Sequence, residues 1–105
     1  MASRTLIDAN VLREAAGDAV ATLKVLANEE RLLLLCQLSR GEASVGELED
    51  QLGIHQPTLS QQLGVLRAQG VVETRRDGKR IYYRVADPSL LKIITVLYRL
   101  FCSQR

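Results

Sequence analysis

The hydrophobic positions of this chain follow a helical period over most of its length and a strand period in one stretch. Apolar residues at helical spacing, bounded by capping and breaking residues, predict helices at about residues 8–27, 29–39, 44–53, 57–69 and 87–103. Residues 71–76 and 79–85 are rich in β-branched and aromatic side chains, and Asp77-Gly78 between them signals a two-residue hairpin loop. The predicted order is ααααββα, a mainly α fold with one β-hairpin.

The third predicted helix has clear signals at both ends. Ser44 and Glu47 have the spacing of a capping box, which predicts that the helix starts at Ser44. Gly53 suits the left-handed conformation that commonly ends a helix. Residues 52–55 then form a connection to the next helix that is short enough for a helix-turn-helix.

The fourth predicted helix combines an apolar face with a face of short polar side chains. Leu59, Leu63 and Leu66 repeat at helical spacing and are predicted to be buried. The polar residues then lie outward, where Gln, Ser and Thr side chains can hydrogen-bond to base edges in the major groove of DNA. The candidate base-reading residues are Gln56, Thr58, Ser60 and Gln61.

The hairpin tip concentrates positive charge. Residues 1–54 hold 5 Lys and Arg against 9 Asp and Glu (net −4), and residues 55–105 hold 9 against 3 (net +6), which together give the +2 of the chain. A cationic ribbon directly after a helix-turn-helix favours contacts with DNA phosphates or with the minor groove. The candidate residues for these contacts are Arg75, Arg76, Lys79 and Arg80. This half of the chain indicates a DNA-binding regulator.

Length and composition exclude several other classes of protein. At 105 residues we expect one domain over residues 8–105, preceded by a flexible N-terminus at residues 1–7. No apolar run is long enough for a signal peptide or a membrane span, so we expect a cytoplasmic protein with no membrane partner. With one His, no phosphate-cradling Gly-rich loop and no plausible Ser/His/Asp set, the chain is not expected to be an enzyme.

From Ala21 to Cys102 the chain resembles the winged helix-turn-helix repressors of the ArsR/SmtB family. The resemblance rests on the segments LKVLANEERLLLLCQL and GELEDQLGIHQPTLSQQLGVLRAQGVVETRRDGKRIYYRV. It implies a homodimer, built from the first and last helices, that binds an imperfect palindrome in double-stranded operator DNA and represses transcription until an inducer weakens binding. The apolar residues of the last predicted helix favour a dimer independently, because they offer more apolar surface than one small domain covers.

The chain departs from the metal-binding members of that family. One familiar metal site uses a Cys-x-Cys pattern in the third helix, but residues 47–51 contain no Cys. Another uses Asp and His ligands along the last helix, and residues 88–105 contain no His. We therefore expect no metal and no cofactor.

Cys36 and Cys102 are placed as in the sulfide- and persulfide-responsive BigR/SqrR branch of the family. The resemblance implies that this dithiol senses per- or polysulfide, or an oxidant, and releases the operator on forming a disulfide or a longer sulfur bridge. Alternatives stay open from the residues alone. In the first, Cys36 is a small buried side chain and Cys102 a helix-end residue, and neither has a sensing role. In the second, the two thiolates bind a metalloid or metal such as trivalent arsenic or cadmium. In the third, the fold is a redox-insensitive module that binds a protein.

Overall fold

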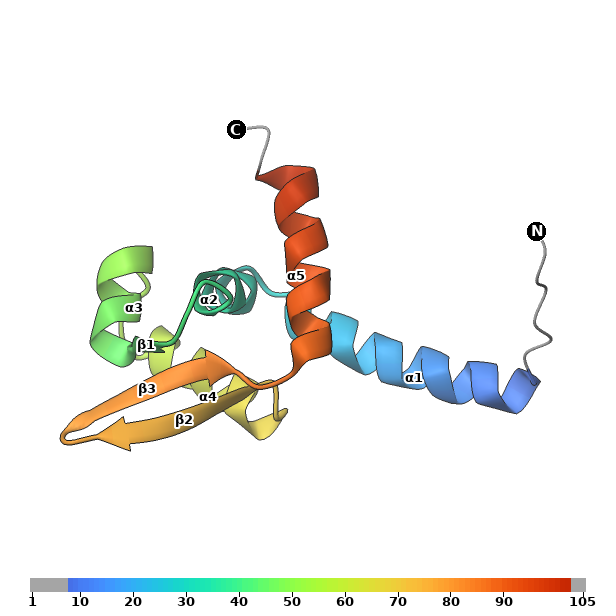
Figure 1. Cartoon of the computed structure of the whole chain (residues 1–105), viewed down its shortest axis with the longest axis horizontal. Helices are drawn as coiled ribbons and strands as arrows, with labels where there is room; N and C mark the ends of the chain where they lie inside the picture. Colours follow the sequence, from blue (N-terminus) through green and yellow to red (C-terminus); the bar gives the residue numbers. More distant parts are fainter. Residues whose placement is uncertain (1–7, 103–105) are drawn as a thin grey trace.

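The structure of the protein, a computed structural model, describes residues 8–102. Within them the order is α1 (Ala9–Leu26), α2 (Glu29–Leu38), β1 (Ala43–Ser44), α3 (Val45–Leu52), α4 (Thr58–Ala68), β2 (Val72–Asp77), β3 (Arg80–Val85) and α5 (Pro88–Phe101) (Figure 1). This confirms the predicted winged helix-turn-helix with its ααααββα order. The predicted flexibility of residues 1–7 and the predicted end of the last helix at 103 lie outside the described residues.

Strand β1 was not predicted, because a two-residue strand shows no period. It pairs antiparallel with β3, so the sheet has the order β1-β3-β2. Ala43 lies opposite Tyr83 and Ser44 lies opposite Tyr82. Since Ser44 is also the N-cap of α3, this pairing joins the middle of β3 to the helix-turn-helix.

The hairpin loop lies one residue later than predicted. Asp77 pairs with Arg80, so the two-residue loop is Gly78-Lys79 and not Asp77-Gly78. Gly78 has a φ of 65°, which a residue with a side chain rarely adopts, so it suits the first position of this loop. As side chains alternate along a strand, Arg75 and Arg76 point to opposite faces of the hairpin.

The predicted ends of α3 are confirmed. The Ser44 hydroxyl accepts a hydrogen bond from the Glu47 backbone N–H at 3.2 Å, and the Glu47 carboxylate accepts one from the Ser44 N–H at 2.8 Å. Gly53 ends the helix with a φ of 69°, in the left-handed region. Helix α4 begins at Thr58, with Pro57 at the N-cap position.

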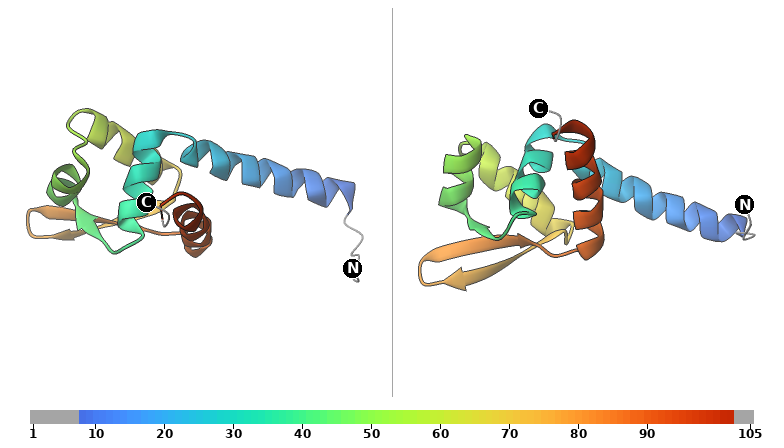
Figure 2. Two further views of the ribbon diagram at one scale, coloured as in Figure 1. Left: turned by 90° about the horizontal axis from the view of Figure 1, so that it is seen from above. Right: turned by 45° about the horizontal axis from the view of Figure 1, so that its top comes forward.

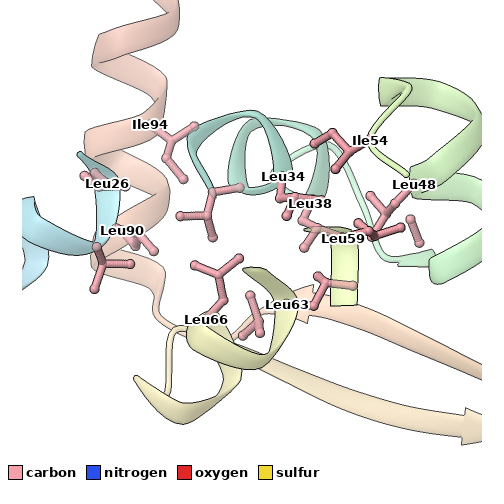
Figure 3. Close-up of a cluster of buried hydrophobic side chains, with 14 residues drawn as sticks. Leu26, Leu34, Leu38, Leu48, Ile54, Leu59, Leu63, Leu66, Leu90 and Ile94 are labelled. Carbon is pink, nitrogen blue, oxygen red and sulfur yellow. The ribbon is translucent and has the colours of Figure 1, made fainter. Parts of the chain in front are cut away.

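Helix α2 lies at the centre of the hydrophobic core. Leu34 and Leu35 are fully buried. Side chains from α1, α3, α4 and α5 pack around them (Figure 3), among them Leu26, Leu48, Leu59, Leu63, Leu66, Leu90 and Ile94. The predicted buried stripe of α4 is therefore confirmed.

Helices α1 and α5 leave apolar side chains uncovered. Helix α1 extends away from the core in every view, and residues 8–21 are exposed (Figures 1 and 2). The large apolar side chains exposed on the two helices are Val11, Leu12, Val20, Leu23, Val96, Tyr98, Leu100 and Phe101. Among the described residues, no helix has the combination of length and apolar character needed to cross a membrane.

The packing of α2 predicts very different effects for two adjacent leucines. Leu34→Ala is expected to lower the free energy of unfolding by about 3 kcal/mol, because truncating a fully buried side chain leaves a cavity. Leu33, which is 41% exposed, is the matched control, and Leu33→Ala is expected to cost less than about 1 kcal/mol. Guanidinium unfolding at one fixed protein concentration measures both; equal losses would contradict the core assigned to α2.

Candidate DNA-binding surface and dithiol cleft

The base-reading candidates lie at the N-terminal end of α4. Leu59 and Leu63 hold the opposite side of this helix in the core, so Ser60 and Gln61 are exposed. Gln56 is also exposed, and Thr58 is half-buried. The structure therefore brings three of the four candidates to the open surface.

Gln56 and Ser60 form a hydrogen-bonded unit at the start of α4. The Gln56 side-chain oxygen accepts bonds from the Ser60 backbone N–H at 3.1 Å and from the Ser60 hydroxyl at 2.6 Å. Gln56 thus supplies a cap for α4 that the Pro57 position cannot supply. Its amide NH₂ remains as the donor that can be offered to a base or phosphate.

The four cations of the hairpin tip fall into two groups. Arg76, Lys79 and Arg80 are exposed, and within residues 8–102 no ion pair holds them. Arg75 is different, because its guanidinium is bound by Glu42. Its Nε lies 2.9 and 3.0 Å from the two carboxylate oxygens of Glu42, and a terminal nitrogen makes a further contact with that carboxylate.

The Glu42–Arg75 pair is a clasp between the hairpin and the loop after α2. Arg75 also lies 4.6 Å over the ring of Tyr82, its cross-strand neighbour on β3. The hydrogen bond from Arg75 holds the pKa of Glu42 below its usual value, and Glu42 raises the pKa of Arg75. A phosphate that approaches Arg75 must compete with this carboxylate. Sequence analysis missed Glu42, because it lies 33 positions from Arg75 and belongs to no motif.

Cys36 and Cys102 line one cleft between α2, α3 and α5, with a volume of about 380 Å³. Its apolar lining comes from Leu33, Leu52, Ile94 and Tyr98. Both cysteines are free thiols; Cys36 is half-buried and Cys102 is exposed. Burial raises the pKa of the Cys36 thiol, and electrostatic repulsion from Cys102 raises this pKa further, to a smaller extent. No group of three or more potential metal ligands occurs within the described part of the chain.

A helix-turn-helix followed by a cationic antiparallel wing defines the winged-helix class of DNA-binding proteins. Within this class the chain belongs to the arsR family of bacterial regulatory proteins. The family described as "Bacterial regulatory protein, arsR family" matches residues 28–74, which contain α2, both helices of the helix-turn-helix and the first part of the wing. Its relatives are transcription regulators, which confirms that the chain is not an enzyme.

The similarity extends over nearly the whole chain. The "Biofilm growth-associated repressor" of Xylella fastidiosa strain Temecula1 is 50% identical over 93 residues, which are 89% of this chain and 82% of that protein. The crystal structure of the transcriptional repressor BigR from Xylella fastidiosa has a TM-score of 0.84 at 48% identity, covering 91% of this chain and 98% of that one. Reduced HlyU from Vibrio cholerae has a TM-score of 0.83 at 40% identity, covering 87% and 96%.

The exposed face of α4 predicts a loss of sequence preference on substitution. Gln61→Ala is expected to remove about 1–3 kcal/mol of discrimination at one base position, because the amide can pair with a base edge. Binding to a set of operators that each carry one base change measures this effect. Gln69→Ala, at the other end of α4, is the matched control. An unchanged preference in Gln61→Ala would show that the reading face is wrongly assigned.

The wing predicts opposite effects for two substitutions. Lys79→Ala is expected to weaken binding to all duplex DNA and to reduce the slope of log K against log salt by about 1, because one phosphate contact is lost. Glu42→Gln is expected to tighten binding about twofold to fivefold and steepen that slope by up to about 1, because removing the negative charge of Glu42 weakens its hold on Arg75 and leaves the guanidinium more available to phosphate. If Glu42→Gln leaves both quantities unchanged, the clasp does not withhold Arg75 from DNA.

Proposed function

We propose that this protein is a homodimeric, cytoplasmic repressor of transcription whose dithiol, Cys36 and Cys102, senses reactive sulfur or oxidants. The observation that carries the proposal is the shared cleft: residues 66 positions apart in the sequence place both thiols against one volume of about 380 Å³. The similarity to a repressor over 89% of the chain supports repression of transcription by this protein. The operator is expected to be an imperfect palindrome in double-stranded DNA, read by α4 and held by the wing.

The dimer is supported by the apolar surface that one chain leaves open. Leu12 on α1 and Leu100 on α5 are 56% and 59% exposed, and neighbours on the same helices are similarly uncovered. A two-fold pair covers such surface and places two copies of α4 on successive turns of DNA. The inducer then acts on α5, which belongs both to the proposed interface and to the dithiol cleft and is followed directly by Cys102.

The chemistry is assigned to start at Cys102, because it is exposed whereas burial raises the pKa of Cys36. The Cys102 thiolate attacks the outer sulfur of a low-molecular-weight persulfide, RSSH, which yields Cys102 persulfide and the thiol RSH. Cys36 then attacks the inner sulfur, forms the Cys36–Cys102 disulfide and releases hydrogen sulfide. The two cysteines lose two electrons and the transferred sulfur gains them. Where both cysteines carry a persulfide, a further RSSH oxidises the pair to a longer bridge and leaves as RSH and hydrogen sulfide.

A bridge between α2 and α5 is energetically sufficient to change DNA binding. A tenfold loss of affinity requires only about 1.4 kcal/mol of difference between two arrangements of the domain. Closing the bridge draws the C-terminal end of α5 to α2, and α2 in turn packs on α4. The proposed output is therefore a change in how the two reading helices meet the operator.

A metalloid-responsive repressor is the second candidate, because two thiolates facing one cleft can bind a soft ion such as trivalent arsenic. Such an ion prefers a third ligand, and within residues 8–102 no third potential ligand joins the two thiols. This favours sulfur chemistry over metalloid binding. A redox-insensitive interaction module remains the third candidate, and salt-dependent binding to an operator excludes it.

The decisive experiment is intact mass spectrometry of the reduced dimer after separate treatment with an organic persulfide and with arsenite, with DNA binding measured on each product. We expect persulfide to link Cys36 to Cys102, with or without added sulfur atoms, and to lower operator affinity at least about tenfold. Cys36→Ser is expected to accumulate a persulfide on Cys102 without releasing DNA. Cys102→Ser is expected to react much more slowly, because only the half-buried thiol remains.

Two results would count against this reading. Tight arsenite binding with release of DNA, together with no response to persulfide, would replace sulfur sensing by metalloid sensing. A Cys102→Ser variant that reacts as fast as the wild type would reverse the assigned order of attack. Sedimentation equilibrium of the untreated protein tests the dimer separately.

A further inference from the structure

Arg31, in the first turn of α2, connects three helices. Its Nε donates to the backbone carbonyl of Val25 at 2.7 Å, and one terminal nitrogen donates to the carbonyl of Lys24 at 3.1 Å. The other terminal nitrogen donates to the side-chain oxygen of Gln62 at 3.1 Å. Val25 and Lys24 belong to the last turn of α1, and Gln62 belongs to α4.

Helices α1 and α4 do not pack face to face where Arg31 joins them. A groove of about 330 Å³ separates them, lined by Ala21 and Val25 of α1, by Val65 of α4, and by Arg31 itself. The only chain between α1 and α2 is Ala27-Asn28, and Asn28 is the N-cap that accepts a hydrogen bond from the Arg31 backbone N–H at 3.0 Å. The direction in which α1 leaves the core therefore depends on this junction and on the Arg31 side chain.

A guanidinium suits this position for two physical reasons. The last carbonyls of a helix lack intrahelical partners and carry the negative end of the helix dipole, so a cation at the C-terminal end of α1 is favourable. The planar fork of Arg also spans acceptors on two helices in one fixed geometry, which the single ammonium of Lys does not. Bonds to charged donors are stronger than neutral ones, so the fork resists displacement of α1 relative to α4.

Gln62 is directed toward Arg31 and not toward the base-reading face. It is half-buried, whereas its neighbour Gln61 is exposed. Because its side-chain oxygen accepts a hydrogen bond from Arg31, Gln62 links the end of α1 to α4, the candidate base-reading helix. A substitution of Gln62 thus alters this link while the base-reading candidates stay in place.

We propose that Arg31 and Gln62 are positioning residues that set the angle between α1 and α4, and so set the spacing of the two DNA half-sites that the dimer accepts. The inference rests on the proposed homodimer, in which α1 of each subunit contributes to the interface. Inserting one base pair between half-sites separates them by about 3.4 Å and rotates one by about 34° around the duplex. The hydrogen bonds of Arg31 to Gln62 and to the end of α1 are called the clamp below. A dimer whose α1–α4 angle is held by the clamp is expected to bind the altered operator poorly, and a dimer without the clamp is expected to bind it better.

The test compares operators that differ only in half-site spacing. The operator is first selected from random duplex DNA by the wild-type protein, and versions with one base pair inserted or removed at its centre are then prepared. Wild type is expected to prefer the selected spacing about tenfold or more, and Gln62→Ala is expected to reduce this ratio about threefold to tenfold. Affinity for an isolated half-site is expected to stay within about twofold, since no base contact is lost.

Two further variants separate positioning from a general structural effect. Gln62→Glu retains an oxygen for Arg31, so it is expected to keep the spacing preference even where its added negative charge weakens all DNA binding. Gln51→Ala removes a comparable bond between helices, from the Gln37 amide to the Gln51 side chain at 2.9 Å, but leaves α1 untouched. It is expected to keep the wild-type ratio. The ratio is insensitive to uniform losses of affinity or stability.

The outcomes distinguish the clamp from the dimer on which it rests. If wild type is a dimer on its operator and Gln62→Ala keeps the wild-type spacing ratio, the proposed role of the clamp is wrong and the proposed homodimer stands. The same holds if Gln51→Ala lowers the ratio as much as Gln62→Ala does. If sedimentation equilibrium shows that the wild-type protein is monomeric both free and on DNA, the proposed homodimer is contradicted, and the proposed spacing role of the clamp is contradicted with it.

Discussion

Burial of the apolar side of α2 is the constraint on which the remaining structure depends. This ten-residue helix packs against α1, α3, α4, α5 and β3, and its Leu34 and Leu35 have no exposed surface. Three residues with proposed roles lie on or just after this helix: Arg31 in its first turn, Cys36 in its last turn, and Glu42 in the loop that follows it. Because α2 is close-packed on most sides, it moves as a unit or hardly at all. The proposed roles of Cys36, of the α1 junction and of the wing therefore all depend on how this one helix is packed.

Local structure was predictable because it depends on neighbours in the sequence. The capping box at Ser44, the left-handed Gly53 and the leucine stripe of α4 all follow from spacings of three or four residues. The misplaced hairpin loop shows the limit of that approach, since Asp77-Gly78 and Gly78-Lys79 both contain a suitable glycine. Only the pairing of Asp77 with Arg80 across the strands decides between them.

The links between elements were not predictable in the same way. The bonds from Arg75 to Glu42 and from Arg31 to Gln62 join residues 33 and 31 positions apart, and no periodicity marks either pair. On sequence grounds Arg75 belonged with the other cations of the wing, and Gln62 was merely one of several glutamines. Each acquires its role from the packing of helices and strands that brings its partner within reach. Cys36 and Cys102 are an intermediate case: family resemblance indicated these two cysteines, whereas their position on one cleft is visible only in the structure.

The exposed apolar side chains of α1 have a consequence for the protein before it binds DNA. A newly synthesised subunit displays Val11, Leu12, Val20 and Leu23 on an arm that its own core does not shield. Exposed apolar segments are what chaperones retain and proteases cut, so a chain whose first helix stays uncovered is open to both. In the homodimer proposed above, pairing of two chains would cover these side chains and remove that exposure.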